Sequence, residues 1–379
     1  MSLPRSTRYD AVVIGAGLIG LSCAWRARKR GMSVLVVDRA AAPGAGTSDV
    51  AAGMLAPVTE MDFGEEGPLR VNMLARERWP GFAAELEEVT GLPTGYRDTG
   101  ALVVAVDRDD AEALRRLHEL HGSLGLASEW LTPSRCRALE PGLSPRIAGG
   151  IAASQDGSAD PRATVRALAA AVSEVELGVE VEAIEHDGSS VTGVRTSGGT
   201  VAAGQVVVAA GPWSASLAPV GDGPPVRPVK GQILELRTRG AMPSPFERVL
   251  RTPRCYLVSR GDGRVVIGAT VEEQGFDTTV TADGVFRLLE AAWEVLPEVG
   301  ELELLGARAG LRPGTPDNAP VVGRGELDGL IWATGHWRNG VLLAPITGDA
   351  VAALLAGDEL PEDLGALSPA RFSVTGVHR

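Results

Sequence analysis

The chain has 379 residues, enough for two domains with separate cores. Its formal net charge of −12 argues against nucleic acid as a partner, because phosphate binding requires a concentrated basic surface. The N-terminal sequence MSLPRSTRYD has no apolar signal core, and no run reaches about 18 apolar residues, so we expect no membrane span. Cys23, Cys136 and Cys255 are scattered, which favours a reducing cytoplasm over a disulfide framework.

A glycine-rich turn lies between two apolar runs near the N-terminus. Residues 12–20 read VVIGAGLIG, a helical pattern follows, and a second apolar run ends at Asp38. This is the βαβ dinucleotide fingerprint in its full context. Gly15 permits the tight turn, Gly17 lets the backbone approach a pyrophosphate, and Gly20 allows the helix to pack on the sheet. We expect the helix N-terminus to hold phosphates and Asp38 to accept hydrogen bonds from ribose hydroxyls.

The rest of the chain is predicted to contain both helices and strands. The Asp160-Pro161 pair predicts a helix start, because Asp is a good N-cap and Pro fits the first helical position. Hydrophobic periodicity predicts the remaining elements. The expected helices cover residues 69–90, 109–121, 131–139, 160–175, 281–296 and 346–355. The expected strands cover residues 100–106, 179–184, 191–196, 205–211, 228–236, 256–259, 265–269 and 330–335.

Seven motifs, taken in order, resemble the FAD-dependent D-amino-acid oxidase superfamily and, within it, the glycine oxidases of the thiazole pathway in thiamine biosynthesis. The first is VVIGAGLIG with Asp38. The others are AAGML at 51–55, AAGPWS at 209–214, RPVKGQ at 227–232, YLVSR at 256–260, AGLRPGTPD at 309–317 and GHWRNGVLLAPITG at 335–348.

The resemblance implies an α/β fold with a Rossmann-type FAD-binding domain and an inserted α+β substrate domain on a mainly antiparallel sheet. The inserted domain agrees with the wide separation of the nucleotide-domain strands in the sequence. The expected FAD-binding domain comprises residues 1–62, 145–225 and 305–379. The expected substrate-binding domain comprises residues 63–144 and 226–304.

The resemblance also implies roles for individual residues. Arg312 matches the arginine that binds the substrate carboxylate, and Tyr256 matches a tyrosine that hydrogen-bonds it. Arg338 matches a second arginine at the site, and Met54 matches a residue facing the flavin. An arginine fork suits a carboxylate because its N–H groups match the two oxygens.

The cofactor contacts expected from the fingerprint and the resemblance form one set. It comprises Gly15, Gly17, Leu18, Ile19, Gly20, Asp38, Arg39, Thr47, Ser48, Ala52, Gly53, Met54, Val181, Ala210, Gly211, Trp213, Arg312, His336, Arg338, Asn339, Gly340, Val341 and Leu342.

Two positions depart from related enzymes. Arg254 stands where Bacillus-type members have a histidine two residues before the site tyrosine, which leaves the finer substrate preference open. Related sarcosine oxidases tether their flavin through a cysteine shortly before a Thr-Pro-Asp segment. Gly310 occupies that place here, so we expect FAD to be held without a covalent bond.

Structural alternatives exist for several of these residues. Arg312 alone could pair with Asp317, and Tyr256 could be a packed strand aromatic. A histidine such as His336, just after a strand and turn, is more often a satisfied structural group than a catalyst. His118 and His121 lie three apart on a charged helix, where a solvated face is a better interpretation than a metal site. We therefore expect no metal.

The sequence thus predicts a flavoprotein oxidase that converts glycine, or an N-substituted glycine, to an imine that hydrolyses to glyoxylate, with O₂ reduced to H₂O₂. One alternative is a dehydrogenase that uses a non-oxygen acceptor. Others are a biosynthetic oxidase that removes a carboxymethyl group from a larger secondary amine, which Arg254 and Ala56 leave open, and a non-catalytic flavin-binding module. The expected partners are an amino-acid substrate and O₂, and the resemblance suggests a homotetramer.

Overall fold

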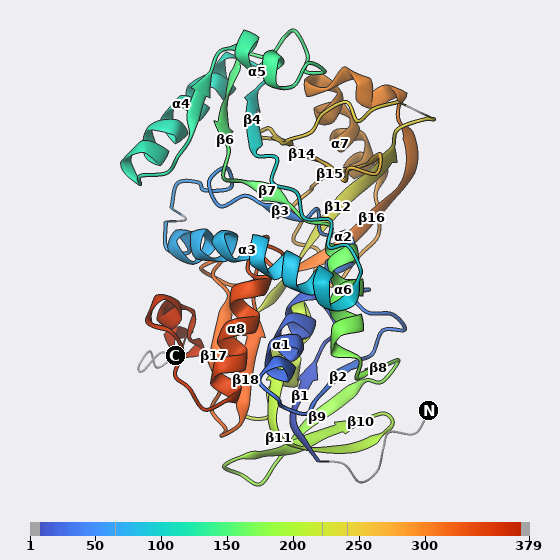
Figure 1. Cartoon of the computed structure of the whole chain (residues 1–379), viewed down its shortest axis with the longest axis vertical. Coiled ribbons are helices and arrows are strands. Elements are labelled where there is room, and N and C mark those ends of the chain that lie inside the picture. The colour runs from blue at the N-terminus through green and yellow to red at the C-terminus, as the bar shows by residue number, and fades with distance from the viewer. Residues whose placement is uncertain (1–7, 65, 222, 241, 373–379) are drawn as a thin grey trace.

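The computed structural model describes residues 8–64, 66–221, 223–240 and 242–372. Within these residues, two large sheets occupy opposite halves of an elongated molecule (Figure 1). The helix α3 (Leu69–Thr90) crosses between the two halves. The strands β12 (Arg227–Arg237) and β16 (Glu303–Gly314) run from the second sheet toward the first.

The first sheet is mainly parallel and has the order β17-β18-β11-β1-β2-β8. Its parallel strands are rich in valine and isoleucine, as expected for strands buried on both faces. The antiparallel hairpin of β9 and β10 extends from β11. The strand bounds are β1 (Tyr9–Ile14), β2 (Val34–Asp38), β8 (Val175–Leu177), β9 (Val181–His186), β10 (Val191–Thr196), β11 (Gly199–Val208), β17 (Val321–Arg324) and β18 (Leu330–Thr334).

Helices cover one face of this sheet and bury the larger hydrophobic core (Figure 1). The helix α6 begins as predicted, because the Asp160 carboxylate accepts hydrogen bonds from the N–H groups of Arg162 (3.0 Å) and Ala163 (3.2 Å). The helices that pack here with α3 are α1 (Leu18–Lys29), α6 (Pro161–Val172) and α8 (Ala344–Leu355).

The second sheet is mainly antiparallel and has the order β16-β12-β15-β14-β13-β4-β6-β5. The helix α7 (Ala282–Val295) packs on it through a second hydrophobic core that includes Leu288, Ala292 and Val295. The other helices in this half of the molecule are α4 (Arg108–Ser123) and α5 (Pro133–Leu139). The remaining strands are β4 (Ala101–Ala105), β5 (Glu129–Leu131), β6 (Gly149–Ala153), β13 (Val249–Arg251), β14 (Tyr256–Ser259) and β15 (Arg264–Gly268).

Short elements connect the two sheets. The helix α2 (Thr47–Val50) precedes β3 (Met54–Leu55), which pairs with β7 (Gly157–Ser158). The 3₁₀ segments are η1 (Gly211–Leu217), η2 (Pro297–Glu301), η3 (Glu362–Leu367) and η4 (Pro369–Phe372).

The α/β class with one mainly parallel and one mainly antiparallel sheet is confirmed. Three elements differ from the expected division into domains. The strands β6 and β16 belong to the second sheet, and β16 does so because it pairs with β12 from Arg227↔Gly314 to Arg237↔Glu303. The helix α3 packs on the first core through Trp79 and Phe82. The division itself therefore stays a proposal.

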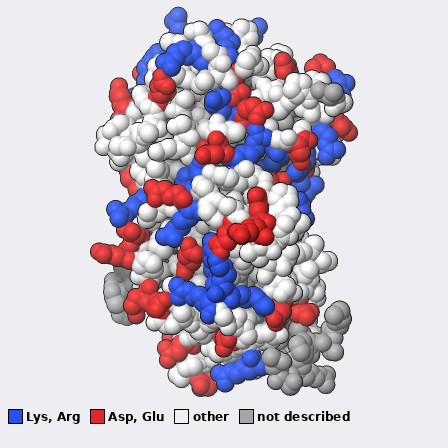
Figure 2. Space-filling view, viewed as in Figure 1, with Lys and Arg blue, Asp and Glu red and all other residues white. Residues whose placement is uncertain are grey.

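Helix length and surface charge both bear on membrane or nucleic-acid binding. Among the described residues, no helix is both long enough and apolar enough to cross a bilayer. On the face shown in Figure 2, small groups of basic side chains adjoin acidic ones. The ion pairs between Arg26 and Glu85 and between Arg78 and Asp349 follow this pattern.

Candidate active site

A cavity of about 770 Å³ extends from the first sheet to the second. Its floor begins at the fingerprint between β1 and α1. A Cβ atom at Gly20 would overlap the carbonyl oxygen of Gly15, so the close packing requires glycine there. A Cβ atom at Gly17 would meet only the Ser48 hydroxyl, at 3.5 Å, so the space above Gly17 is open to a ligand. This open backbone at a helix N-terminus fits the pyrophosphate of FAD.

Asp38 ends β2 beside the fingerprint. Its carboxylate accepts hydrogen bonds from the backbone N–H of Ala16 (2.7 Å) and of Ala40 (2.8 Å), which fix its position at the cavity wall. A carboxylate has about four acceptor sites, so it can also accept ribose hydroxyls. The arrangement fits the predicted role.

The segment 47–54, which contains the residue predicted to face the flavin, forms hydrogen bonds to both α1 and β16. The Ser48 hydroxyl accepts a hydrogen bond from the Leu18 N–H (3.0 Å), at the start of α1. The Thr47 hydroxyl donates to the carbonyl of Leu311 on β16 (2.6 Å). Met54 follows on β3 and lines the cavity.

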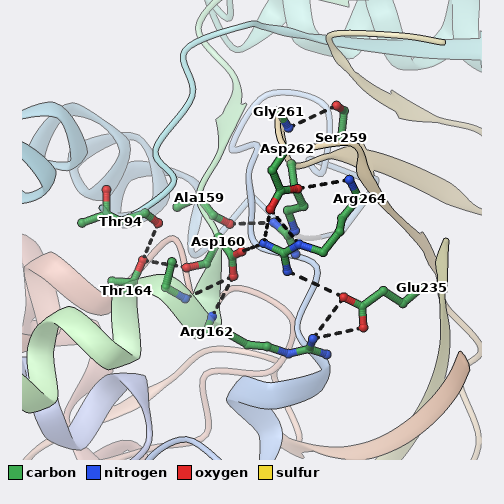
Figure 3. Close-up of polar contacts among 12 residues, drawn as sticks. Thr94, Ala159, Asp160, Arg162, Thr164, Glu235, Ser259, Gly261, Asp262 and Arg264 are labelled. Carbon is green, nitrogen blue, oxygen red and sulfur yellow. Dashed lines mark hydrogen bonds and ion pairs between the residues drawn. The ribbon is translucent and has the colours of Figure 1, made fainter. Parts of the chain in front are cut away.

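Arginine–carboxylate contacts also clamp this segment where the two sheets meet (Figure 3). Arg162 on α6 contacts Glu235 on β12 (Nη1–Oε2 3.0 Å), as Figure 3 shows. Arg162 also donates to the backbone carbonyl of Asp49 (Nη2–O 2.8 Å). Arg264 on β15 contacts Asp160, the N-cap of α6 (Nη2–Oδ2 2.7 Å). The backbone leading to Met54 is therefore held from both halves of the molecule.

At the far end of the cavity, an aromatic and a cationic side chain lie together. The guanidinium carbon of Arg39 is 4.2 Å from the ring centroid of Trp213. Val181, at the start of β9, lines the same end, where the resemblance implies adenine contacts. These residues fit the nucleotide part of FAD.

Four strands of the second sheet place the predicted substrate residues on one face. Tyr256 on β14 pairs with Gly268 on β15, and Gly268 pairs with Ile233 on β12. Ile233 in turn pairs with Arg308 on β16. Directly paired residues share a face, as do residues separated by an even number along a strand. Arg312, four residues after Arg308, therefore projects to the same side as Tyr256.

Two glycines give the long side chains room on this face. A Cβ atom at Gly231 on β12 would overlap the guanidinium of Arg312, and one at Gly268 would overlap the hydroxyl of Tyr256. The Arg312 guanidinium and the Tyr256 hydroxyl therefore lie over adjacent strands, inside the cavity.

The contacts of Arg312 favour the binding interpretation over the structural one. Its Nη1 donates to the carbonyl of Thr270 (3.1 Å), while Asp317 pairs instead with Arg371 (Oδ2–Nε 2.8 Å). Burial raises the pKa of Tyr256, and the charge of Arg312 partly opposes this shift. Tyr256 is thus a neutral hydrogen-bond donor beside a cation, as a carboxylate site requires.

His336 and Arg338 flank Trp337, whose N–H donates to the Pro313 carbonyl beside Arg312 (3.0 Å). His336 is buried, its Nε2 is 3.0 Å from the Thr347 hydroxyl, and burial lowers its pKa to about 3. The imidazole is therefore neutral at ordinary pH, as a structural group would be. Arg338 donates from Nη2 to the backbone carbonyl of Glu60 (2.8 Å).

The cavity brings together all but three of the predicted site residues. Gly20 lies beneath it, where it supports the packing of the fingerprint. Asn339 and Leu342 also lie outside it. The Asn339 N–H donates to the His336 carbonyl (2.9 Å), and the Leu342 carbonyl accepts from the Trp79 indole (3.0 Å).

Several residues of the cavity wall were not predicted from the sequence. Those that bear on the substrate end include Glu60, Gly231, Arg251, Gly268 and Trp337. The hairpin signal Thr-Pro-Arg-Cys before Tyr256 could have indicated one of them, because it places Arg251 opposite Tyr256. No short-range pattern could have revealed the two glycines, since their role depends on neighbouring strands.

The expected solvated histidine face is only half correct. His121 is fully buried, and its Nδ1 is 3.2 Å from the Ser128 hydroxyl, which is also 2.9 Å from Nδ1 of His118. The helix α4 turns His121 inward, toward Ser128 and the backbone of Met61, although its sequence neighbours are charged. In the described part of the chain, no group of three potential metal ligands occurs.

Comparisons with known proteins agree with this site. The family described as "FAD dependent oxidoreductase" matches residues 10–354. The bifunctional protein ThiO/ThiG of Synechocystis sp. is 36% identical over 97% of this chain, which spans 55% of that protein, or about half its length. The glycine oxidase of Geobacillus kaustophilus is 36% identical over 96% of this chain and 97% of its own length.

Solved structures agree as well. A crystal structure of glycine oxidase from Geobacillus kaustophilus has a TM-score of 0.90, with 32% identity over 98% of this chain and 100% of that one. An iminodiacetate oxidase from Chelativorans sp. BNC1 has a TM-score of 0.81, with 27% identity over 95% of this chain and 98% of that one. The chain therefore belongs to the family of FAD-dependent oxidoreductases that includes the glycine oxidases.

Proposed function

We propose that this enzyme oxidises glycine or an N-substituted glycine such as sarcosine. The amine loses two electrons and becomes an imine, and water hydrolyses the imine to glyoxylate and ammonia or an amine. O₂ accepts the two electrons and two protons to give H₂O₂. The glycine oxidase relatives and the iminodiacetate oxidase, whose named substrate is an N-substituted glycine, support this class of substrate.

The observation that carries the proposal is the pairing of Arg312 with Tyr256 inside the cavity. A cationic fork and a neutral hydroxyl over adjacent strands suit one carboxylate. The absence of a side chain at Gly231 and Gly268 gives both groups their space.

The chain contributes position and electrostatics to the reaction. Bound FAD would supply the redox chemistry, as the acceptor of a hydride equivalent from the substrate α-carbon. Arg312 and Tyr256 fix the carboxylate, and so orient the α C–H bond toward the wall formed by Met54. His336 stays neutral because its pKa is lowered to about 3, so it neither repels nor attracts the substrate charge. No acid or base on the protein is required if the amine reacts in its neutral form.

A peroxide-coupled assay tests the proposal. We expect turnover of glycine, sarcosine and N-alkylglycines, with one H₂O₂ formed per glyoxylate, and D-alanine provides the comparison with a branched α-carbon. Turnover that requires a quinone or dye and consumes no oxygen would contradict the oxidase and support the dehydrogenase. An absence of flavin reduction by every amine would support a non-catalytic module.

Other features of the proposal concern the setting of the enzyme. Cys23, Cys136 and Cys255 are buried free thiols, which supports a reducing compartment such as the cytoplasm. A place in thiamine biosynthesis and a homotetrameric state are also proposed, on the family resemblance.

A further inference from the structure

The cavity contains an arginine that the proposed reaction does not use. Arg251 ends β13 and lines the cavity, and its side chain is only 21% exposed. Its guanidinium makes no hydrogen bond to any residue that the structure describes. Its one ion pair there is to Glu60, with Nη2 and Oε1 3.9 Å apart, which is too long for a hydrogen bond. A guanidinium that faces a cavity with all its donors available indicates a site for an anion.

The sheet register places Arg251 beside the substrate residues but apart from Arg312. Arg251 pairs with Tyr256, so both side chains project from the same face. Arg251 and Arg312 stand on the outer strands, β13 and β16, of five neighbouring strands. At about 4.8 Å per strand, their backbones are roughly 19 Å apart. Because Arg312 reaches inward over β12, the two cations flank Tyr256 and leave room for a ligand with two separated acidic groups.

Nearby carboxylates do not satisfy Arg251. The Glu60 carboxylate lies between two arginines, 3.9 Å from Arg251 and 4.0 Å from Nε of Arg338. Asp156 is fully buried and accepts hydrogen bonds from the Val58 N–H (3.1 Å) and from Thr59 (2.9 Å from N, 2.7 Å from Oγ1). Burial raises the pKa of Asp156 to about 6, and its carboxylate oxygens are engaged by Val58 and Thr59 and make no hydrogen bond to Arg251. A ligand carboxylate can therefore gain hydrogen bonds that neither residue supplies.

The neighbouring Arg254 provides the contrast. Its Nη2 contacts the Glu294 carboxylate on α7 at 2.5 Å, and its side chain is 49% exposed. Both arginines line the cavity, but the Arg254 guanidinium is engaged by Glu294, whereas that of Arg251 has no partner within hydrogen-bond distance among the described residues. Arg254, which replaces the histidine of Bacillus-type members, is therefore a weaker candidate than Arg251 for binding a charged substrate.

We infer that Arg251 binds a second acidic group of the substrate, so that the preferred amine is an N-carboxyalkyl glycine. This inference rests on the proposed oxidation of N-substituted glycines. Glycine-type substrates carry no substituent on the α-carbon, so the second acidic group must reside on the nitrogen. Arg312 and Tyr256 then hold the carboxylate next to the oxidised carbon, and Arg251 holds the other.

The test compares iminodiacetate, the smallest such diacid, with sarcosine, which lacks the second carboxylate. The kcat/KM for each is measured in the FAD-loaded wild type and in Arg251→Met, Arg251→Lys and Arg254→Met. We expect Arg251→Met to lower the ratio of kcat/KM for iminodiacetate to that for sarcosine by at least about tenfold, since it removes one partner of a buried charge pair. Arg251→Lys should lower the ratio about threefold, because it keeps the charge without the fork. Arg254→Met should change the ratio less than about twofold, because an exposed ion pair contributes little.

Several results would overturn the inference. These are an unchanged ratio in both Arg251 variants, an equal fall in Arg254→Met, or a wild type that neither oxidises iminodiacetate nor is inhibited by it. A preference for aspartate or glutamate over iminodiacetate would place the second acidic group on the α-carbon and would also contradict it. If Arg251→Met does not fold, Arg251→Lys still provides the comparison.

A binding measurement separates this inference from the proposed function. The visible flavin spectrum is titrated with glutarate and with propionate, neither of which contains an amine to oxidise. We expect glutarate to bind at least about tenfold more tightly than propionate to the wild type, and equally to Arg251→Met. Selective glutarate binding without any amine oxidation would refute the proposed function but retain the anion site. Glycine oxidation with equal binding of glutarate and propionate would retain the proposed function but refute the anion site at Arg251.

Discussion

The two ends of the cavity are built in different ways. The phosphate part of the cofactor end uses main-chain atoms that are close in sequence, at Gly15 and Gly17, and the Asp38 carboxylate ends the next strand. The substrate end uses side chains such as Tyr256 and Arg312, from strands far apart in the sequence. Where a ligand contacts the main chain closely, few residue types fit at each position. Where side chains bind the ligand, one substitution can change which ligand is bound. We therefore expect the cofactor end to stay constant across the family and the substrate end to determine which substrate is oxidised.

The largest predicted effect is at the substrate end. Arg312→Ala should lower kcat/KM for glycine by at least about thirtyfold, because removing one partner of a buried charge pair costs ~2–5 kcal/mol. The visible flavin spectrum should show that FAD stays bound. Arg312→Lys serves as the matched variant and should retain part of the activity. Kinetics unchanged from the wild type in Arg312→Ala would refute the assignment of the carboxylate to this residue.

At the cofactor end, two glycines should fail in different ways. Gly17→Ala fills the open space above the fingerprint without an overlap with the protein, so the chain should fold but bind FAD at least about tenfold more weakly, or by ~1.4 kcal/mol. Gly20→Ala overlaps the Gly15 carbonyl, so it should lower the unfolding temperature of the apoprotein. The measurements are FAD titration and thermal unfolding. Equal behaviour of the two variants would contradict the separate roles.

His336 at the cofactor wall predicts a pH effect on stability. Its pKa is about 3 in the folded protein against 6.5 for the free side chain, so between these values the unfolded chain binds the extra proton. Stability should therefore fall as pH drops, by about 1.4 kcal/mol between pH 7.5 and 5.5 from this group. In His336→Gln this contribution to the pH dependence of the free energy of unfolding should vanish. Urea unfolding at pH 7.5 and at pH 5.5 measures it. The same slope in both proteins would exclude His336 as its source.

The smallest predicted effect is at Tyr256. Tyr256→Phe removes one neutral hydrogen bond to the carboxylate and should raise KM for glycine about fivefold, or by ~1 kcal/mol, with little change in kcat. A fall in kcat as large as that expected for Arg312→Ala would show that Tyr256 does more than hold the substrate.

The same contrast explains what the sequence could predict. The fingerprint and Asp38 follow from local patterns, and β10, β18 and α8 were found with bounds close to those observed, whereas the short edge strands β8 and β17 were not predicted. The strand β16 was not predicted, because the two glycines, the arginine and the proline of AGLRPG are atypical of a strand, and only its pairing with β12 defines it. Gly231 and Gly268 were missed for the same reason, since each gives space to a side chain on a neighbouring strand. Motif resemblance supplied Arg312 and Tyr256, while Arg251 required the register.

Anaerobic flavin reduction tests the central claim most directly. The FAD-loaded enzyme is mixed without oxygen with glycine, sarcosine or methylamine, and its visible absorption is followed. The account predicts that glycine and sarcosine bleach the oxidised flavin, that methylamine does not, and that admitting O₂ restores the colour with formation of H₂O₂. Bleaching by methylamine at the same rate, or no bleaching by any glycine derivative, would contradict an oxidase organised around carboxylate capture.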